Sequence, residues 1–532
     1  MRAAVVCALA AVAAFGATAA SAGPRVTVSG GRIEGFGDGD LNIFLGIPYA
    51  KPPVGDFRWR APAQVGPWRG VLTTTRYSPA CYQTDGRSFG PFTDEFVNVG
   101  RRSEDCLYLN VWSPSKPGRK RPVLLYIHGG GFGSGSTSVP VYDASGLARK
   151  GVVVVTINYR LGVFGFLAHP ALTAESPLKS SGNYGILDMI AALKWVRVNI
   201  DRFGGDPANV TISGQSAGAA AVSDLLVSPA AKGLFARAVI QSGPALGVQS
   251  RMLAQAEKIG QGVSERLGVR SVGELRHLSA DALLAATAVN PPAKGSTPQI
   301  LMAPNVDRKI IAWDPESANG RVISDVPVMA GYNHDEAFIF GAPSGVTPQQ
   351  FEDYVSSRYG DFAARFLAVY PHASGEEASQ SMDDIGRDRY MSQLVLWAER
   401  HAAAQKAALY LYEFNHRYPG SDPNRFRAFH TAEVPYVLGA LTINGVKFTA
   451  DDRQVADQIK TRWVNFMTKG EPNDGASPAW PEWHRAPGRI MLLRSRPEVG
   501  WPVSSKIRFD VSVIMLRPAA SCPCFDQIYL YK

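Results

Sequence analysis

The amino-acid sequence predicts an α/β protein with a large, mostly parallel central sheet that is covered by helices on both faces. The first observation is a set of short, continuous apolar runs, of which 123–127 and 152–157 are the clearest. A strand that is apolar at every position is buried on both faces, which is typical of parallel sheets. The second observation is that helical patterns alternate with these runs, as they do in α/β folds. The chain has 532 residues, which is enough for a large core.

Residues 1–22 differ from the rest of the chain. Arg2 gives a positive start, residues 3–19 are nearly all apolar or small, and residues 20–22 (Ala-Ser-Ala) resemble a cleavage site. This pattern predicts a secretory signal peptide over 1–22, with an uncleaved membrane anchor as the alternative. We expect residues 23–532 to form a single domain that is secreted or periplasmic. No later window approaches the roughly 18 continuous apolar residues of a transmembrane helix, so no membrane insertion is expected once the signal is removed.

The spacing of apolar residues and the local composition predict the helices and strands. We expect strands at 123–127, 152–157, 209–213, 238–241, 326–329 and 408–414, and helices at 188–199 and 219–226. Residues 250–325 and 340–405 look mainly helical. We expect these two segments to be insertions over the edge of the sheet at which functional residues gather.

The pentapeptide 214–218 (Gly-Gln-Ser-Ala-Gly) lies between the predicted strand 209–213 and the predicted helix 219–226. A sharp strand–turn–helix connection with this G-x-S-x-G pattern strains the backbone of the serine and exposes its hydroxyl. The flanking glycines let the strand, turn and helix pack closely. The pattern therefore predicts that Ser216 is a nucleophile. The alternative is a glycine-rich turn that happens to contain a serine.

A second glycine-rich stretch, 128–132 (His-Gly-Gly-Gly-Phe), directly follows the predicted strand 123–127. When a serine attacks a carbonyl group, negative charge develops on the oxygen and needs preorganised N–H donors. Consecutive glycines let the backbone approach closely, so we expect the N–H groups of Gly130, Gly131 and Ala217 to form this oxyanion hole. A flexible loop is one alternative. A phosphate-binding loop is excluded because no Gly-Lys-Ser/Thr ends the stretch.

A nucleophilic serine needs a histidine base and a carboxylate that orients the histidine. With a nucleophile of this type the partners follow in the order serine, acid, histidine, and they lie in loops after strands. Asp335 and Glu336 both follow one predicted strand, and their spacing does not choose between them. His416 and His430 both follow the last predicted strand, and physical reasoning barely separates them.

Charge and cysteine usage limit the partners that we expect. The formal net charge is +9, and the basic clusters at 101–102 and 116–121 lack regularly interleaved aromatic residues, so nucleic-acid binding is not expected. Of the five cysteines Cys7 leaves with the signal, and an even number remains, at positions 81, 106, 522 and 524, as is common in an oxidising compartment. The C-terminal cysteine pair offers too few ligands for a metal, and serine chemistry needs no metal or organic cofactor. The oligomeric state stays open.

The chain resembles the type B carboxylesterase (cholinesterase-like) family of α/β-hydrolases from about residue 26 to about residue 485. The motifs that carry the resemblance are 44–50 (Phe-Leu-Gly-Ile-Pro-Tyr-Ala), 52–55 (Pro-Pro-Val-Gly), 103–110 (Ser-Glu-Asp-Cys-Leu-Tyr-Leu-Asn), 182–188 (Gly-Asn-Tyr-Gly-Ile-Leu-Asp) and 203–207 (Phe-Gly-Gly-Asp-Pro). The resemblance implies the α/β-hydrolase fold, with a large, mostly parallel sheet flanked by helices and helical insertions over the active site.

The same resemblance implies the site residues. The family pattern Gly-x-Asn-x-Asp-Glu falls on 331–336 and implies Glu336 as the acid, and Ala-x-His-x-x-Glu falls on 428–433 and implies His430 as the base. It also implies a Cys81–Cys106 disulfide and the oxyanion donors named above. The implied reaction is hydrolysis of a small-molecule carboxylic ester through an acyl-enzyme intermediate.

Three departures from the family pattern bear on the site. Ala337 replaces a usual glycine after the acid, and Gln215 stands where many relatives have glutamate, which removes a negative charge beside Ser216. The stretch between Cys81 and Cys106 holds no tryptophan, which cholinesterases use to bind a quaternary ammonium. Choline esters are therefore not expected as preferred substrates. A specialised esterase for anionic, phenolic or polyester substrates is a narrower alternative, and a non-catalytic binding protein is the alternative of another class.

Overall fold

The structure is a computed structural model, and it describes residues 23–501 except for 117, 119, 244–249, 288–301, 316–319, 338–340, 342 and 476–477. The predicted signal peptide (1–22) and the cysteines at 522 and 524 lie outside the described residues. No helix in the described part of the chain is long and apolar enough to cross a membrane.

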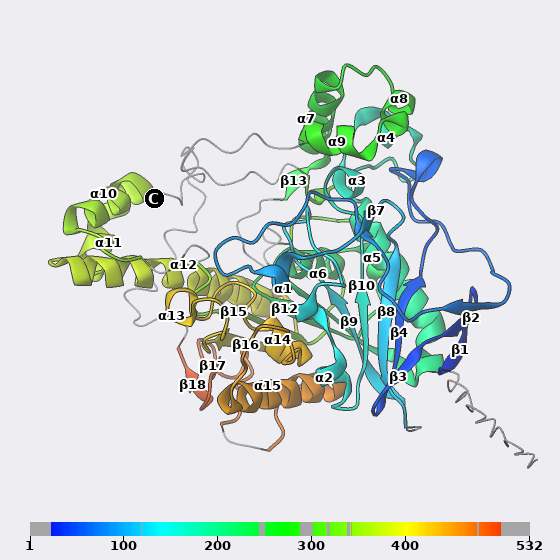
Figure 1. Ribbon diagram of the computed structural model, residues 1–532. Coiled ribbons are helices and arrows are strands. Elements are labelled where there is room, and N and C mark those ends of the chain that lie inside the picture. The colour runs from blue at the N-terminus through cyan, green and yellow to red at the C-terminus, as the bar shows by residue number, and fades with distance from the viewer. Residues whose placement is uncertain are drawn as a thin grey trace, which may run out of the picture.

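The described residues form a central sheet of eleven strands (Figure 1). In spatial order these strands are β18 (Glu498–Gly500), β17 (Ile490–Leu493), β16 (Leu409–Phe414), β15 (Val328–Asn333), β12 (Arg237–Gln241), β11 (Gly205–Gln215), β9 (Arg121–Ile127), β10 (Val153–Ile157), β8 (Tyr108–Pro114), β4 (Leu41–Pro48) and β3 (Phe36–Asp38). All neighbours from β17 to β10 are parallel, whereas β18, β8, β4 and β3 pair antiparallel. The predicted large, mostly parallel sheet is therefore confirmed.

Smaller strands and the helices surround this sheet. The other strands are β1 (Arg25–Val28), β2 (Gly31–Glu34), β5 (Val71–Thr73), β6 (Ala80–Cys81), β7 (Arg102–Ser103), β13 (Arg251–Met252) and β14 (Asn305–Val306). The α-helices are α1 (Asp94–Val97), α2 (Ser145–Ala148), α3 (Gly162–Phe166), α4 (Pro170–Glu175), α5 (Tyr184–Asn199), α6 (Ala217–Leu226), α7 (Leu253–Arg266), α8 (Val272–His277), α9 (Ala280–Thr287), α10 (Pro348–Tyr359), α11 (Ala363–Val369), α12 (Gly375–Ala404), α13 (Pro423–Phe426), α14 (Val434–Leu438) and α15 (Ala450–Lys469).

Strand β9 explains why the sequence of the sheet is apolar at consecutive positions. Its residues Val123, Leu125 and Ile127 belong to the apolar cluster that includes the buried faces of α5 and α6. Leu124 and Tyr126 belong to the cluster on the other face, with α14 and α15. Because successive side chains of a strand point to opposite faces, a strand between two helical layers needs an apolar residue at every position.

Two further groups of helices pack at the margins of the fold. In Figure 1, α7–α9 lie at the top of the view and α10–α12 at its left. Helices α10–α12 confirm that residues 340–405 are mainly helical, and they share a small apolar cluster of their own. The helical prediction for 250–325 is confirmed at α7–α9, and it is wrong for the described residues from 302 to 325, which contain no helix.

Asp307 gives a physical reason why residues 309–311 are not part of a helix. Its Oδ1 accepts the backbone N–H groups of Lys309, Ile310 and Ile311 at 2.8–3.0 Å. A side chain that takes up consecutive backbone donors offers the chain an alternative to helical hydrogen bonds. Composition alone does not reveal such a bond, so the segment resembled a helix in the sequence.

The order of the parallel strands brings distant segments to one edge of the sheet. Strand β9 leads into the loop 128–135, β11 into Ser216 and β12 into Ser242, while Glu336 and His430 follow β15 and β16. These five strands are neighbours in the sheet and run parallel. Their carboxyl ends therefore open on the same edge, where α/β folds place their ligands.

Candidate active site

Ser216 sits in the sharp turn between β11 and α6. Its backbone φ is 57° and its ψ is −123°, a region that residues other than glycine rarely occupy and that costs about 1–3 kcal/mol. The turn is fixed from the neighbouring strand, because the N–H of Ser216 donates to the carbonyl oxygen of Gln241 at 2.9 Å. This is the strained strand–turn–helix geometry that the G-x-S-x-G pattern predicts.

Gly218 shows why the pattern ends in glycine. A Cβ atom at this position would lie 2.1 Å from the carbonyl oxygen of Ile127 and 2.9 Å from that of His128. The first turn of α6 thus packs directly on the backbone at which β9 enters the glycine-rich loop. Any side chain at position 218 would push the two segments apart.

The glycine-rich loop 128–135 also lies against Ser216. A Cβ atom on Gly129 would lie 3.1 Å from Cβ of Ser216. Within the loop, the carbonyl oxygen of Gly130 accepts the N–H of Gly133 at 3.1 Å and that of Ser134 at 2.9 Å. The loop that carries Gly130 and Gly131 therefore meets the turn of Ser216 at Gly129.

Glu336 and His430 are joined by a hydrogen bond. His430 Nδ1–H donates to Glu336 Oε2 at 2.5 Å, and the carboxylate side chain is only 1% exposed. The other carboxylate oxygen, Oε1, accepts the hydroxyl of Ser242 at 2.5 Å and the N–H of Asn333 at 2.8 Å. The acid is held from several sides, and it holds the imidazole in turn.

Asp335 and His416, the candidates that spacing alone left open, are engaged elsewhere. Asp335 Oδ2 accepts the N–H of Ala428 at 3.1 Å. His416 Nε2 lies 2.8 Å from Oδ1 of Asp452, which is buried. The contacts of the structure thus join Glu336 to His430 and give the two alternatives other partners.

Gln215 approaches the second nitrogen of His430. Its side-chain N–H donates to His430 Nε2 at 3.2 Å, so the imidazole carries its proton on Nδ1. Within the described part of the chain, no hydrogen bond joins the hydroxyl of Ser216 to His430. The structure places His430 beside the residue that precedes Ser216, with its Nε2 occupied by an amide.

A second buried carboxyl group, Glu433, lies near the pair. It accepts the side-chain amides of Asn333 at 2.6 Å and of Gln241 at 3.2 Å. Burial and the charge of Glu336 raise the pKa of Glu433 to about 7. Burial lowers the pKa of His430, but the charge and hydrogen bond of Glu336 and the charge of Glu433 outweigh it, so the pKa is raised above its usual value.

Ser242 and Glu433 carry no role in the sequence prediction. Ser242 directly follows the predicted strand 238–241, and its backbone φ of 54° marks a second strained turn at this edge. Glu433 lies within the Ala-x-His-x-x-Glu pattern that points to His430. Position after a strand and membership of a motif are the signals that could have found them.

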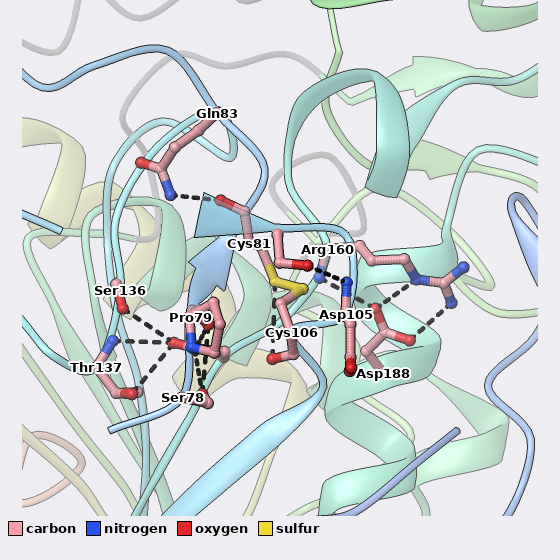
Figure 2. The surroundings of a disulfide bond; sticks show 12 residues. Ser78, Pro79, Cys81, Gln83, Asp105, Cys106, Ser136, Thr137, Arg160 and Asp188 are labelled. Atoms are coloured by element: carbon pink, nitrogen blue, oxygen red, sulfur yellow. Dashed lines mark hydrogen bonds and ion pairs between the residues drawn. A yellow bond between two sulfur atoms is a disulfide. The ribbon is translucent and has the colours of Figure 1, made fainter. Parts of the chain in front are cut away.

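The predicted Cys81–Cys106 disulfide is present and is shown with its surroundings in Figure 2. The loop that it closes contacts the residue before His430 through aromatic rings. Phe92 and Phe96 contact the ring of Phe429, the neighbour of His430, with centroid distances of 5.6 and 5.5 Å. Among the described residues, no group of three or more His, Cys, Asp or Glu side chains is arranged to hold a metal ion.

Family, sequence and structure comparisons with known proteins all point to esterases. The sequence pattern of the carboxylesterase family matches residues 22–508. The chain is 37% identical over 481 residues to a fumonisin B1 esterase of Sphingopyxis macrogoltabida, with 88% of this chain and 85% of that protein covered. It is 35% identical over 483 residues to a para-nitrobenzyl esterase of Bacillus subtilis (strain 168), with 88% and 94% covered.

A solved structure of a PNB esterase superimposes with a TM-score of 0.77 at 33% identity, covering 92% of this chain and 99% of that one. The fold is therefore the α/β-hydrolase fold that the sequence resemblance implies. The chain belongs to the carboxylesterase family and is a carboxylic ester hydrolase.

Proposed function

We propose that Ser216, His430 and Glu336 form the catalytic triad of this esterase. The observation that carries the proposal is the buried hydrogen bond from His430 to Glu336 beside the strained turn of Ser216. The bond leaves the proton of the neutral imidazole on Nδ1 and a lone pair on Nε2. That lone pair is what a general base needs in order to accept a hydroxyl proton.

The proposed reaction has two halves. His430 Nε2 accepts the hydroxyl proton of Ser216 while the serine oxygen bonds to the ester carbonyl carbon, and the N–H groups of Gly130, Gly131 and Ala217 hold the oxyanion. The C–O bond to the alcohol then breaks, and His430 protonates the leaving oxygen. Water repeats the sequence on the acyl-enzyme and releases the acid. Glu336 stabilises the imidazolium at both stages.

Gln215 donates to His430 Nε2, so its amide must release that nitrogen before the hydroxyl of Ser216 can bond to it. Catalytic hydrogen bonds often tighten only when substrate is bound, so this contact is compatible with the triad.

Labelling with a fluorophosphonate tests the proposal. The reagent transfers its phosphonyl group to an activated serine oxygen with loss of fluoride. We expect one label per chain, located on the peptide with Ser216 by mass spectrometry, with ester hydrolysis lost in parallel. A label on another residue, or full hydrolysis by labelled protein, would overturn the assignment. A non-catalytic binding protein would neither react nor hydrolyse esters.

The pH dependence of activity should shift when Gln215 becomes glutamate. His430 acts as a base only when neutral, so kcat/KM falls as the pH drops through its raised pKa. In Gln215→Glu a carboxylate replaces the amide at Nε2, which favours the imidazolium and moves this acid limb upward by about one pH unit or more.

The control for this shift is Gln215→Leu, which removes the amide bond without adding charge. We expect a clearly smaller displacement of the acid limb, measured as kcat/KM against pH for both variants and the wild type. Coinciding profiles of Gln215→Glu and the wild type would contradict the assignment of His430 as the base.

A narrower candidate is a specialised esterase for anionic, phenolic or polyester substrates. The 37% sequence identity to a fumonisin B1 esterase and the net charge of +9 favour this candidate. Rates on fumonisin B1, para-nitrobenzyl esters, neutral alkyl esters and anionic esters would separate the candidates. A preference for anionic esters that weakens with added salt would indicate electrostatic attraction. Similar rates on neutral esters would indicate a broad carboxylesterase.

We also propose that the protein is secreted or periplasmic and that residues 23–532 form a single domain. The Cys81–Cys106 disulfide supports export, because disulfides persist in oxidising compartments. Sequencing the N-terminus of protein recovered from the producing cells would test cleavage after residue 22.

A further inference from the structure

Gln83 is a buried glutamine in the disulfide loop, and its side chain is bonded to the glycine-rich loop. Its Nε2–H donates to the carbonyl oxygen of Gly135 at 2.8 Å, and its Oε1 accepts the N–H of the same residue at 2.8 Å. The residue is 1% exposed. One amide thus satisfies both backbone groups of Gly135.

Gly135 transmits this contact to the start of the glycine-rich loop. A Cβ atom on Gly135 would lie 2.5 Å from Nδ1 of His128 and 2.6 Å from the carbonyl oxygen of Gly129. The backbone at 135 therefore packs directly on the residues that precede Gly130. Displacing Gly135 would displace the segment that carries the proposed oxyanion donors.

The loop needs support from outside because it is intrinsically flexible. Five of its eight residues, 128–135, are glycine, the residue with the largest conformational freedom in the unfolded chain. Oxyanion donors help only when they are fixed before the reaction, and misplacement of about 1 Å can lower a rate about 100-fold. A clamp on this loop thus acts on the chemical step.

Gln83 is itself held firmly. Its Nε2–H also donates to the carbonyl oxygen of Cys81 at 2.9 Å, a bond drawn in Figure 2. Arg102 donates to the backbone carbonyl of Gln83 at 2.8 Å. Strands β6 and β7 pair here, and the disulfide joins Cys81 to Cys106. The amide is therefore oriented before any substrate arrives.

We propose that Gln83 is a positioning residue that fixes the oxyanion hole through Gly135, and that the disulfide loop serves catalysis in this way. The inference rests on the proposed serine mechanism. Gln83 acts through the backbone and does not contact substrate. Its removal should weaken binding of the transition state more than binding of the ester.

The test compares the full-length wild type with Gln83→Leu. We expect kcat to fall roughly 10- to 100-fold while KM stays within about threefold, since one complete oxyanion donor is worth about 10²–10³. The inhibition constant of a trifluoromethyl ketone, which forms an oxyanion on the serine, should rise by the same factor as kcat falls. Active sites are counted with a fluorophosphonate, so that kcat refers to folded enzyme only.

Gln405→Leu is the matched control. Gln405 is also a buried glutamine, and its amide donates to the carbonyl oxygen of Gly320 at 3.1 Å, away from the glycine-rich loop. We expect its kcat per active site and its ketone affinity to equal those of the wild type. An equal loss in both variants would mean that Gln83 has only a structural role and would overturn the inference.

Gln83→Glu keeps the test available if the leucine variant folds poorly. An ionised carboxylate can accept from Gly135 but cannot donate to it, whereas a protonated carboxyl restores both bonds. The ratio of its kcat to that of the wild type should therefore rise as the pH falls. A ratio of one at all pH values would overturn the inference. Lack of hydrolysis and labelling in the wild type would instead overturn the serine mechanism.

Discussion

Ser216→Ala is expected to lower kcat for ester hydrolysis by about 10⁴–10⁶-fold, the scale of triad losses in serine hydrolases. The methyl group of alanine cannot form the acyl-enzyme, so only the oxyanion donors and substrate binding remain to accelerate direct attack by water. Removing the hydroxyl leaves the turn intact, because the N–H of residue 216 still bonds to Gln241. The measurement is the steady-state rate on a chromogenic ester, with circular dichroism to verify folding.

Ser223→Ala is the matched control for this loss. Ser223 is a buried serine of α6 whose hydroxyl donates to the carbonyl oxygen of Ala219 at 3.3 Å. We expect its rate to stay within a few-fold of the wild type. The double variant Ser216→Ala/His430→Ala should be no slower than either single variant, because triad members act as a unit. Residual activity of Ser216→Ala above a few per cent would refute the role of Ser216.

Asp188→Ala is expected to lower the free energy of unfolding by about 3–5 kcal/mol, because it leaves a buried guanidinium unpaired. Arg160 Nε and Nη2 bond to the two oxygens of Asp188 at 2.8 and 2.7 Å, and the side chains are 3% and 0% exposed (Figure 2). Burial raises the pKa of Asp188 despite the attraction of Arg160. Burying the pair therefore costs desolvation free energy, and removing one partner costs more because the other charge stays buried. Urea denaturation at pH 7 measures the change.

Two further variants test whether the lost stability comes from the unpaired buried charge. Arg160→Met/Asp188→Leu should recover part of the lost stability, because apolar residues remove the unpaired charge. The exposed pair Lys469–Glu471 is the control, and Glu471→Ala should change the unfolding free energy by about 1 kcal/mol or less. Equal effects of Asp188→Ala and Glu471→Ala would mean that the Arg160–Asp188 pair is not the buried support described above.

The central strands could be predicted because their sequence and their environment agree. Every residue of the run 123–127 is apolar, and alternate residues face the two helical layers in turn. The observed strand β9 spans Arg121–Ile127 and includes this run. The turn at residues 309–311 could not be predicted in the same way, because the carboxylate of Asp307 binds its backbone N–H groups. Local composition predicts which segments are buried, but it does not predict hydrogen bonds between a side chain and the backbone.

The same distinction between local pattern and distant contacts applies to the candidate site. The turn at Ser216 is local, so its pattern was sufficient to predict the strained conformation. The choice between His416 and His430 depends on contacts between distant segments, and the resemblance to a family supplied it before the structure did. Gln83 was not found at all, because its partner Gly135 lies 52 residues away and neither residue belongs to a recognised motif.

The contact of Gly218 with the carbonyls of Ile127 and His128 has a consequence for laboratory evolution of this enzyme. The turn and the loop share one surface of backbone, so a substitution that widens either one will misalign the other. Libraries that seek new substrates should keep both segments constant and diversify α10, α11 and the first part of α12, which share a small apolar cluster separate from the central layers.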